Sequence, residues 1–380
     1  GRGADRDMTG PRELLLRSGL PNVRDKARRG EPIAAAFLGG SITEGAGASD
    51  AEATSWRART AEYLAERFGE GTRSVNAGVG GTTSAFGAHR LALHAFGEGD
   101  IDLLFVEFAV NDWDYGANVR DTALRGMEGI VRQCGRLMPR ADIVFVYAAS
   151  DRNISEELPL TIAIHEEVAS RYGIPSINLA SRIRMLVEAG AIRWDELAPD
   201  RVHPNDEGYA LYASTVRECL NFALSADEGA DDAAESEEPA GLLPEPLIDG
   251  HYGEAKLLDI GIAESADGFA ASDRKPGALM NWRYPIRHLH ADREGASLTF
   301  RTTGKGAGVV LLCGPDTGIF EYSVNGGEFQ EANPFDDWCT VAYRPVILLF
   351  PAERESGELR VELRNTANKD GRSAGTGLRV

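Results

Sequence analysis

Cysteine is scarce in this sequence, and so are long apolar runs. The 380 residues include four cysteines, which lie far apart and form no Cys-x-x-Cys pair: Cys134, Cys219, Cys313 and Cys339. A zinc site or a dense disulfide framework is therefore not expected, and a reducing compartment is favoured. No segment approaches the roughly 18 apolar residues of a membrane span, and the N-terminal residues lack the apolar core of a signal peptide. These absences predict a cytoplasmic protein without a metal or a membrane partner.

Positive charge is also in short supply. Lys and Arg number 40 against 59 Asp and Glu, which gives a formal net charge of -19. Nucleic acid and anionic membranes repel such a protein, so neither is expected as a partner, whereas neutral ligands such as sugars remain open. Hydrophobic residues make up 43% and charged residues 26%, which argues against disorder. Because the chain is long for a single core, two domains are expected. The sequence leaves open whether the protein forms an oligomer.

The first part of the chain alternates short apolar runs with longer amphipathic ones. Strands that are apolar on both faces and separated by helices predict an α/β domain, with a parallel sheet covered on both sides. The amphipathic pattern predicts helices at 56–68 and 161–172. In such folds the active site lies at the carboxyl ends of the strands, and Ser41 follows directly on the first strand. The expected strands are 33–38, 74–77, 103–109, 143–148 and 176–179.

The composition changes after this region. Residues 226–246 are acidic, rich in small residues and punctuated by proline, and they predict a linker. Beyond it, short runs bounded by Gly, Pro and Asn predict an all-β sandwich, jelly-roll-like, at 247–380, and Asn325-Gly326 predicts a tight hairpin. The expected organisation is therefore an N-terminal extension with a helix at 1–29, an α/β domain at 30–225, the linker and the β domain.

Several segments of the α/β region carry groups suited to acyl transfer. Ser41 offers a nucleophilic hydroxyl, and the pair Asp200-x-x-His203 offers an imidazole base with a carboxylate to orient it. Gly81 and Asn111, after the second and third strands, can supply N–H donors to an oxyanion. Each segment alone has an ordinary interpretation as a turn or a cap. Their combination at one rim of a parallel sheet indicates a serine hydrolase.

This set of residues resembles the SGNH (GDSL-type) hydrolase superfamily, whose four blocks carry Ser, Gly, Asn and His. The matching residues are Ser41, Gly81, Asn111 and His203, and Asp200 stands where the family places the third triad member. The resemblance covers about residues 30–225 and implies a flavodoxin-like three-layer domain. It also implies that Ser41, His203 and Asp200 form the catalytic triad, and that Ser41, Gly81 and Asn111 form the oxyanion hole.

The sequence departs from the family pattern at two places. The usual Gly-Asp-Ser-Leu reads Gly-Gly-Ser-Ile at 39–42, and the usual glycine two residues before the asparagine is Ala109. The run Gly-Gly-Ser-Ile-Thr looks like the carbohydrate-esterase branch, several of whose members carry a β-sandwich. The resemblance thus implies an acetylesterase without a cofactor, acting on acetylated oligosaccharides such as mannan or xylan fragments. Trp113, Tyr115 and Trp282 are candidate substrate contacts.

Other interpretations are weaker. A phosphate loop at 39–47 lacks the lysine of a Walker motif, and the Gly-rich run at 78–83 departs from the dinucleotide fingerprint at Thr83. His288 and His290 have no nearby carboxylate cluster with which to ligate a metal. Two alternatives stay open: an esterase for non-carbohydrate short-chain esters, and a carbohydrate-binding protein without catalysis.

Overall fold

The computed structural model describes residues 10–225 and 243–380. The chain divides into two compact units, Gly1–Leu257 and Leu258–Val380, each with its own hydrophobic core. The beginning of the expected N-terminal extension, residues 1–9, and most of the expected linker, residues 226–242, lie outside the described residues.

The boundary between the units lies further along the chain than residue 247, where the sequence predicted the β domain to begin. The backbone N–H groups of Leu247 and Ile248 donate to the Glu128 carboxylate at 2.8 and 3.1 Å. The Gln133 side chain donates to the Tyr252 carbonyl at 2.9 Å. These hydrogen bonds hold residues 243–257 on the first unit, and a local sequence pattern carries no signal for such long-range pairing.

The first unit is built on a six-stranded sheet of order β1-β6-β5-β4-β2-β3. β2 to β6 run parallel, and β1 pairs antiparallel with β6 at one edge. Every residue of β2 is buried, as expected for a strand covered on both faces. All the expected strands are present, and the short β1 was missed. The strands are β1 (Leu14–Leu15), β2 (Ala34–Gly39), β3 (Arg73–Gly78), β4 (Leu103–Glu107), β5 (Asp142–Tyr147) and β6 (Ser176–Asn178).

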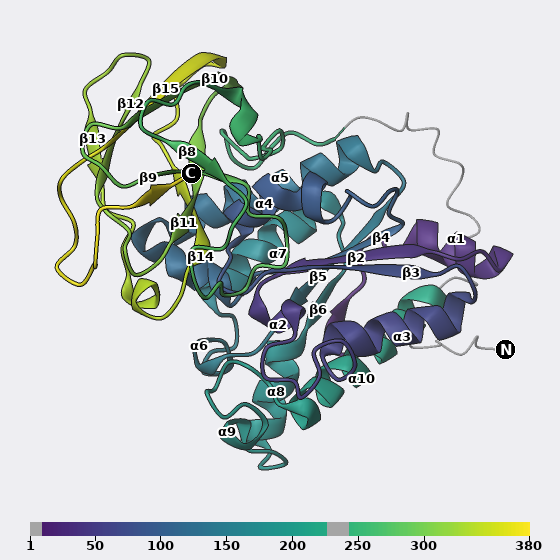
Figure 1. The fold of residues 1–380 in the computed structure, drawn as a ribbon. Helices are drawn as coiled ribbons and strands as arrows, with labels where there is room; N and C mark the ends of the chain where they lie inside the picture. The colour runs from purple at the N-terminus through teal and green to yellow at the C-terminus, as the bar shows by residue number, and fades with distance from the viewer. Residues whose placement is uncertain (1–9, 226–242) are drawn as a thin grey trace, which may run out of the picture. The chain divides into compact units, whose positions relative to one another are not determined.

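Helices cover both faces of this sheet (Figure 1), which confirms the three-layer α/β/α architecture. α4, α5 and α7 pack together on one face, and α3 and α10 pack together on the other. The long helices are α1 (Pro21–Arg29), α3 (Trp56–Phe68), α4 (Ser84–His94), α5 (Val119–Leu137), α7 (Leu160–Tyr172), α8 (Leu179–Glu188) and α10 (Asp206–Ser225). Short helical segments follow strand ends or precede α10: α2 (Ser41–Glu44), η1 (Asn111–Asn118), α6 (Asp151–Ile154) and α9 (Trp194–Leu197).

The second unit is all-β, as predicted, with antiparallel sheets. Its largest sheet has the order β13-β12-β15-β10-β7, beside a β11-β14 pair and a β16-β9-β8 sheet. Asn325 and Gly326 have φ values of 54° and 73° after β12, as a two-residue hairpin turn requires. The strands are β7 (Ala263–Ser265), β8 (Ala270–Ser272), β9 (His288–Ala291), β10 (Ser297–Gly304), β11 (Gly308–Cys313), β12 (Phe320–Val324), β13 (Gln330–Ala332), β14 (Arg344–Leu349), β15 (Gly357–Asn365) and β16 (Leu378–Arg379).

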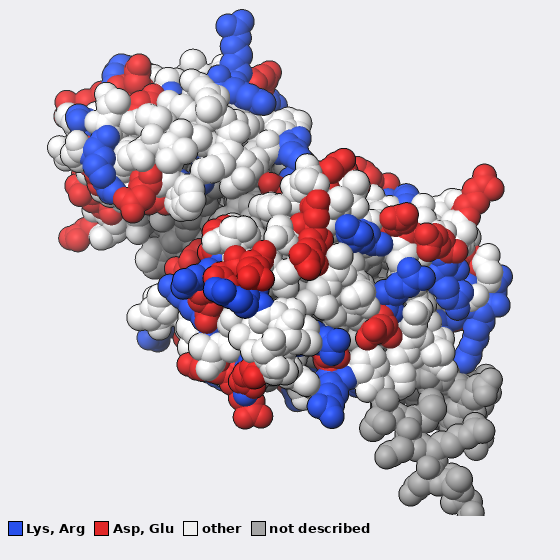
Figure 2. Space-filling view, turned by 90° about the horizontal axis from the view of Figure 1, so that it is seen from below, with Lys and Arg blue, Asp and Glu red and all other residues white. Residues whose placement is uncertain are grey.

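The surface mixes charges of both signs. Figure 2 shows basic side chains lying among acidic ones on the face in view. Ion pairs are formed in both units, for example Arg120–Glu167 at 2.7 Å and Arg301–Glu358 at 2.6 Å. Within residues 10–225 and 243–380, no helix is both long enough and apolar enough to cross a bilayer.

Candidate active site

Ser41 lies at the carboxyl end of β2, where it is the first residue of α2. Its hydroxyl Oγ is 2.7 Å from Nε2 of His203, although 162 residues separate the two in the chain. This distance is within the range for proton transfer between a nucleophile and a general base. The spatial convergence on which the sequence interpretation depended is therefore present.

His203 is oriented by Asp200. Nδ1 of His203 lies 2.6 Å from Oδ2 of Asp200, and Oδ1 of the same carboxylate accepts the backbone N–H groups of Val202 and His203 at 3.0 and 2.7 Å. Burial works against ionisation of Asp200, but the hydrogen bonds from His203 and Val202 outweigh it and lower the pKa of the carboxyl group. An ionised Asp200 accepts the proton of Nδ1, which leaves the lone pair of Nε2 directed at the Ser41 hydroxyl.

Hydrogen bonds connect the beginning of α10, which follows His203, to the segment after Ser41. Oδ1 of Asp206 accepts the Ser49 backbone N–H at 2.8 Å and the Thr54 hydroxyl at 2.7 Å. The Tyr209 hydroxyl donates to the carbonyl of Ala46 at 2.6 Å. These bonds join the segments that carry Ser41 and His203 across a large sequence separation.

The Asn111 amide lies against Gly40, the residue before Ser41. A Cβ added to Gly40 would lie 2.2 Å from Oδ1 and 3.1 Å from Nδ2 of Asn111. A glycine at position 40 is therefore required by the close approach of this amide. The structure thus places the Asn111 amide against the residue that precedes Ser41; its role as an oxyanion donor stays a prediction.

The loop that contains Gly81, residues 79–83, is hydrogen-bonded to α2, the short helix that begins at Ser41. The backbone N–H of Gly80 donates to the carboxylate of Glu44, the last residue of α2, at 2.9 Å. Gly81 follows with φ of +72°, a left-handed conformation that favours glycine. No atom lies within 4 Å of the position that a Gly81 Cβ would take. The backbone at Gly81 is therefore open on that side.

Buried Arg90 joins the ends of the strands that carry these loops. Its guanidinium donates to the carbonyls of Ala77 at 2.5 Å and Gly39 at 2.9 Å, and to the Thr82 hydroxyl at 3.2 Å. The side chain has no exposed surface. Arg90 thus connects the ends of β2 and β3 immediately before Ser41 and the glycine loop.

A buried acid beneath α2 was missed by the sequence interpretation. Glu107 ends β4, pairs with Gly39 in the sheet, and accepts the hydroxyl proton of Thr43 at 2.8 Å. Complete burial raises the pKa of Glu107 to about 8, although the hydrogen bond from Thr43 acts in the opposite direction. A signal was present in the sequence, because Glu107 interrupts an otherwise apolar strand at 103–109.

The three candidate substrate contacts lie in different surroundings. Trp113, in η1, donates from its indole N–H to Asn153 at 3.1 Å, and the Arg152 guanidinium lies 5.7 Å from its ring centre. The side chain of Tyr115 lies outside the described part of the chain. Trp282 belongs to the second unit, where it packs edge-on against Tyr284 at 5.1 Å. Their contacts with substrate stay predictions.

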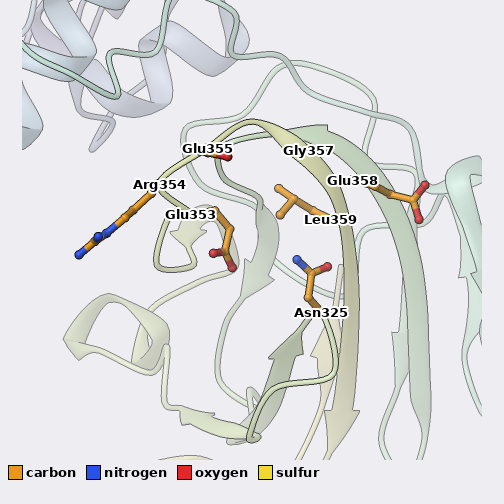
Figure 3. Close-up of a pocket in the computed structure, with 7 residues that line it drawn as sticks. All are labelled: Asn325, Glu353, Arg354, Glu355, Gly357, Glu358 and Leu359. Atoms are coloured by element: carbon orange, nitrogen blue, oxygen red, sulfur yellow. The ribbon is translucent and has the colours of Figure 1, made fainter.

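Two other kinds of site bear on the function of the protein, a metal centre and a sugar-binding pocket. Among the described residues, no three His, Cys, Asp or Glu side chains are grouped so that they could hold a metal ion. A wide, open pocket in the second unit has a volume of about 570 Å³ (Figure 3). Its lining has three glutamates and one arginine and includes no aromatic ring for stacking on a sugar: Asn325, Glu353, Arg354, Glu355, Gly357, Glu358 and Leu359.

The sequence of the first unit matches a known protein family. Residues 37–211 match the GDSL-like lipase/acylhydrolase family. The first unit is a GDSL-like acylhydrolase domain. The four segments described above all fall within the matched range, and the family assignment makes the protein an ester hydrolase.

Solved structures of similar proteins extend over both units. The crystal structure of a two-domain esterase (CEX) active on acetylated mannans is 25% identical, with a TM-score of 0.79, and the match covers 97% of this chain and 96% of that one. The same esterase crystallised with mannopentaose gives 24% identity and a TM-score of 0.76 over 95% and 92% of the two chains. A search of curated protein sequences gives no match. The acylhydrolase domain of this chain therefore carries an all-β unit in the same arrangement along the sequence as that esterase.

Proposed function

We propose that the protein is a serine esterase that removes O-acetyl groups from oligosaccharides, with fragments of acetylated mannan as the first candidate substrates. The observation that carries the proposal is the hydrogen-bonded series Ser41–His203–Asp200 at the rim of an acylhydrolase domain. The substrate class is supported by the similar two-domain structure, which is that of an esterase active on acetylated mannans.

In the acylation step, Nε2 of His203 takes the proton of the Ser41 hydroxyl while Oγ attacks the carbonyl carbon of the acetyl ester. Asp200 fixes the tautomer of the imidazole and stabilises the imidazolium that forms. The N–H groups of Ser41 and Gly81 and the amide of Asn111 donate to the oxyanion of the tetrahedral intermediate. Each such donor typically contributes roughly 3–4 kcal/mol to stabilisation of the transition state.

Collapse of the intermediate breaks the bond to the sugar oxygen, which takes the proton from His203 and leaves as the free hydroxyl. The acetyl group then remains on Ser41. Water attacks this acyl-enzyme with His203 again as the base, and acetate is released with the hydroxyl of Ser41 restored.

The test is mass spectrometry of a panel of acetylated manno-, xylo- and amino-sugar oligomers treated with the wild type or with Ser41→Ala. We expect loss of acetyl groups from at least one oligomer series with the wild type and none with the variant. Activity on simple acetate esters without loss from any oligomer would remove the carbohydrate part of the proposal. If neither protein hydrolyses any ester but both bind the oligomers, the protein is a binding protein instead.

A further inference from the structure

A second Asp–His pair lies immediately beneath the candidate oxyanion hole. Asp112, the residue after Asn111, is fully buried, and its Oδ2 is 2.7 Å from Nε2 of His165 in α7. The two side chains are 0% and 1% exposed. This pair does not touch the Ser41 hydroxyl in any of the hydrogen bonds described, so the steps of ester hydrolysis give it no chemical role.

The pair connects both loops that supply the oxyanion donors. Oδ1 of Asp112 accepts the backbone N–H of Ser84 at 2.9 Å. Ser84 begins α4 directly after the Gly81 loop, and the side chain of Thr83 does not cap this helix. Asp112 therefore caps α4, and a carboxylate at this end of a helix also suits the helix dipole.

α7 forms hydrogen bonds to residues before and after Asn111 in the sequence. His165 binds the carboxylate of Asp112, and the hydroxyl of Thr161, one turn earlier in α7, donates to the carbonyl of Ala109 at 2.7 Å. Thr161 is also fully buried. Residues four apart lie on the same face of a helix, so a single face of α7 holds the residues immediately flanking the Val110-Asn111 dipeptide.

His165 has a hydrogen-bond partner on one ring nitrogen. Nε2 faces Asp112, whereas Nδ1 is buried with no partner among the described residues. A proton on Nδ1 would be a buried donor without a partner, which costs free energy. A proton on Nε2, in contrast, is donated to the carboxylate of Asp112.

We infer that Asp112, His165 and Thr161 are positioning residues that hold the Asn111 amide and the Gly81 loop in the geometry an oxyanion requires. The inference rests on the proposed function, since it gives these residues a role in the same acyl transfer. They act through Asn111 and Ser84 and do not contact the reacting atoms. Their loss should therefore weaken binding of the transition state more than binding of the substrate.

The test compares kcat and KM on a soluble chromogenic acetate ester for His165→Leu, His165→Gln and Thr161→Val. For His165→Leu we expect kcat to fall about 10- to 100-fold with KM changed by less than about twofold, because donors are displaced without being removed. His165→Gln should recover a large part of this loss, since its amide N–H can still donate to Asp112. Thr161→Val, which keeps the shape of the side chain, should lower kcat by a smaller factor.

A double-mutant cycle with Asn111→Ala separates positioning from general destabilisation. If His165 acts on the oxyanion donors, His165→Leu should lower log kcat less than half as much in the Asn111→Ala background as in the wild type. Gln133→Leu is the matched control: Gln133 is fully buried and donates to the carbonyls of Ala88 and Tyr252. It should lower thermal stability and leave kcat nearly unchanged.

The outcomes distinguish this inference from the proposed function. Ser41→Ala and Asn111→Ala are measured in the same series, and full activity of both would refute the proposed chemistry itself. If both are impaired while His165→Leu and Thr161→Val keep wild-type kcat, only the positioning role is refuted. An undiminished effect of His165→Leu in the Asn111→Ala background would also refute it. If His165→Leu does not fold, Thr161→Val and its cycle with Asn111→Ala decide the question.

Discussion

Replacing Gly40 with alanine should disable the oxyanion hole without removing any chemical group. The new Cβ would lie 2.2 Å from Oδ1 and 2.8 Å from Cγ of Asn111, whereas an ordinary contact needs about 3.4 Å or more. The amide must therefore move by about 1 Å, and a displacement of that size can cost about 10²-fold in rate. We expect Gly40→Ala to lower kcat by about 10²-fold and Asn111→Ala by about 10²–10³-fold, with little change in KM.

The assay is steady-state hydrolysis of a chromogenic acetate ester, with thermal denaturation to show that each variant is folded. Because Gly40→Ala acts by displacing Asn111, it should have almost no further effect when Asn111 is already alanine. The reasoning is refuted if the losses of the two single variants simply multiply in the double variant. That result would mean that the added methyl group disturbs Ser41 instead.

Three further predictions concern the groups around this site. Burial raises the pKa of Glu107 to about 8 in the folded protein. The protonated carboxyl therefore contributes fully to stability below the pKa of the unfolded chain, and this contribution is lost as the pH rises through about 8. Between about pH 6.5 and 8, the free energy of unfolding should fall by about 2 kcal/mol more in the wild type than in Glu107→Gln, as measured by urea denaturation. Asp142, with a pKa raised by burial to about 6, titrates mainly below this interval. Asp200→Asn should lower kcat by up to about 10⁴-fold while the circular dichroism spectrum is unchanged, because His203 loses the partner that fixes its tautomer; a loss below about tenfold would argue against the assigned role. Arg90→Leu should lower the free energy of unfolding by about 3 kcal/mol or more, because it removes three buried hydrogen bonds, and an unchanged denaturation midpoint would contradict this.

Much of the first unit could be predicted because its signals are local. The strand that ends at Gly39 is apolar along its length, so both its burial and its parallel neighbours follow from the sequence. Parallel strands present their carboxyl ends at one edge, which makes the convergence of Ser41 and Asn111 an expected result. The close spacing of Asp200 and His203 likewise predicted a contact that the structure contains.

The remaining features depend on pairings between distant residues. Asp112 and His165 are 53 residues apart, and nothing in either segment indicates that they form a buried pair. Glu128 accepts backbone N–H groups from residues 119 and 120 positions further along, which is why the extent of the first unit was not evident from composition. Glu107 differs, because an acid within an apolar strand is a visible signal of a special environment. These are cases in which tertiary contacts override what a local pattern can show.

The most direct test of the whole account is the mass of the protein quenched with acid during turnover of an acetyl ester. We expect a fraction of the wild type to carry one acetyl group, located on the peptide that contains Ser41, and Ser41→Ala to carry none and to release no acetate. Release of acetate by Ser41→Ala at the wild-type rate would contradict the account, because the ester would then be cleaved without Ser41.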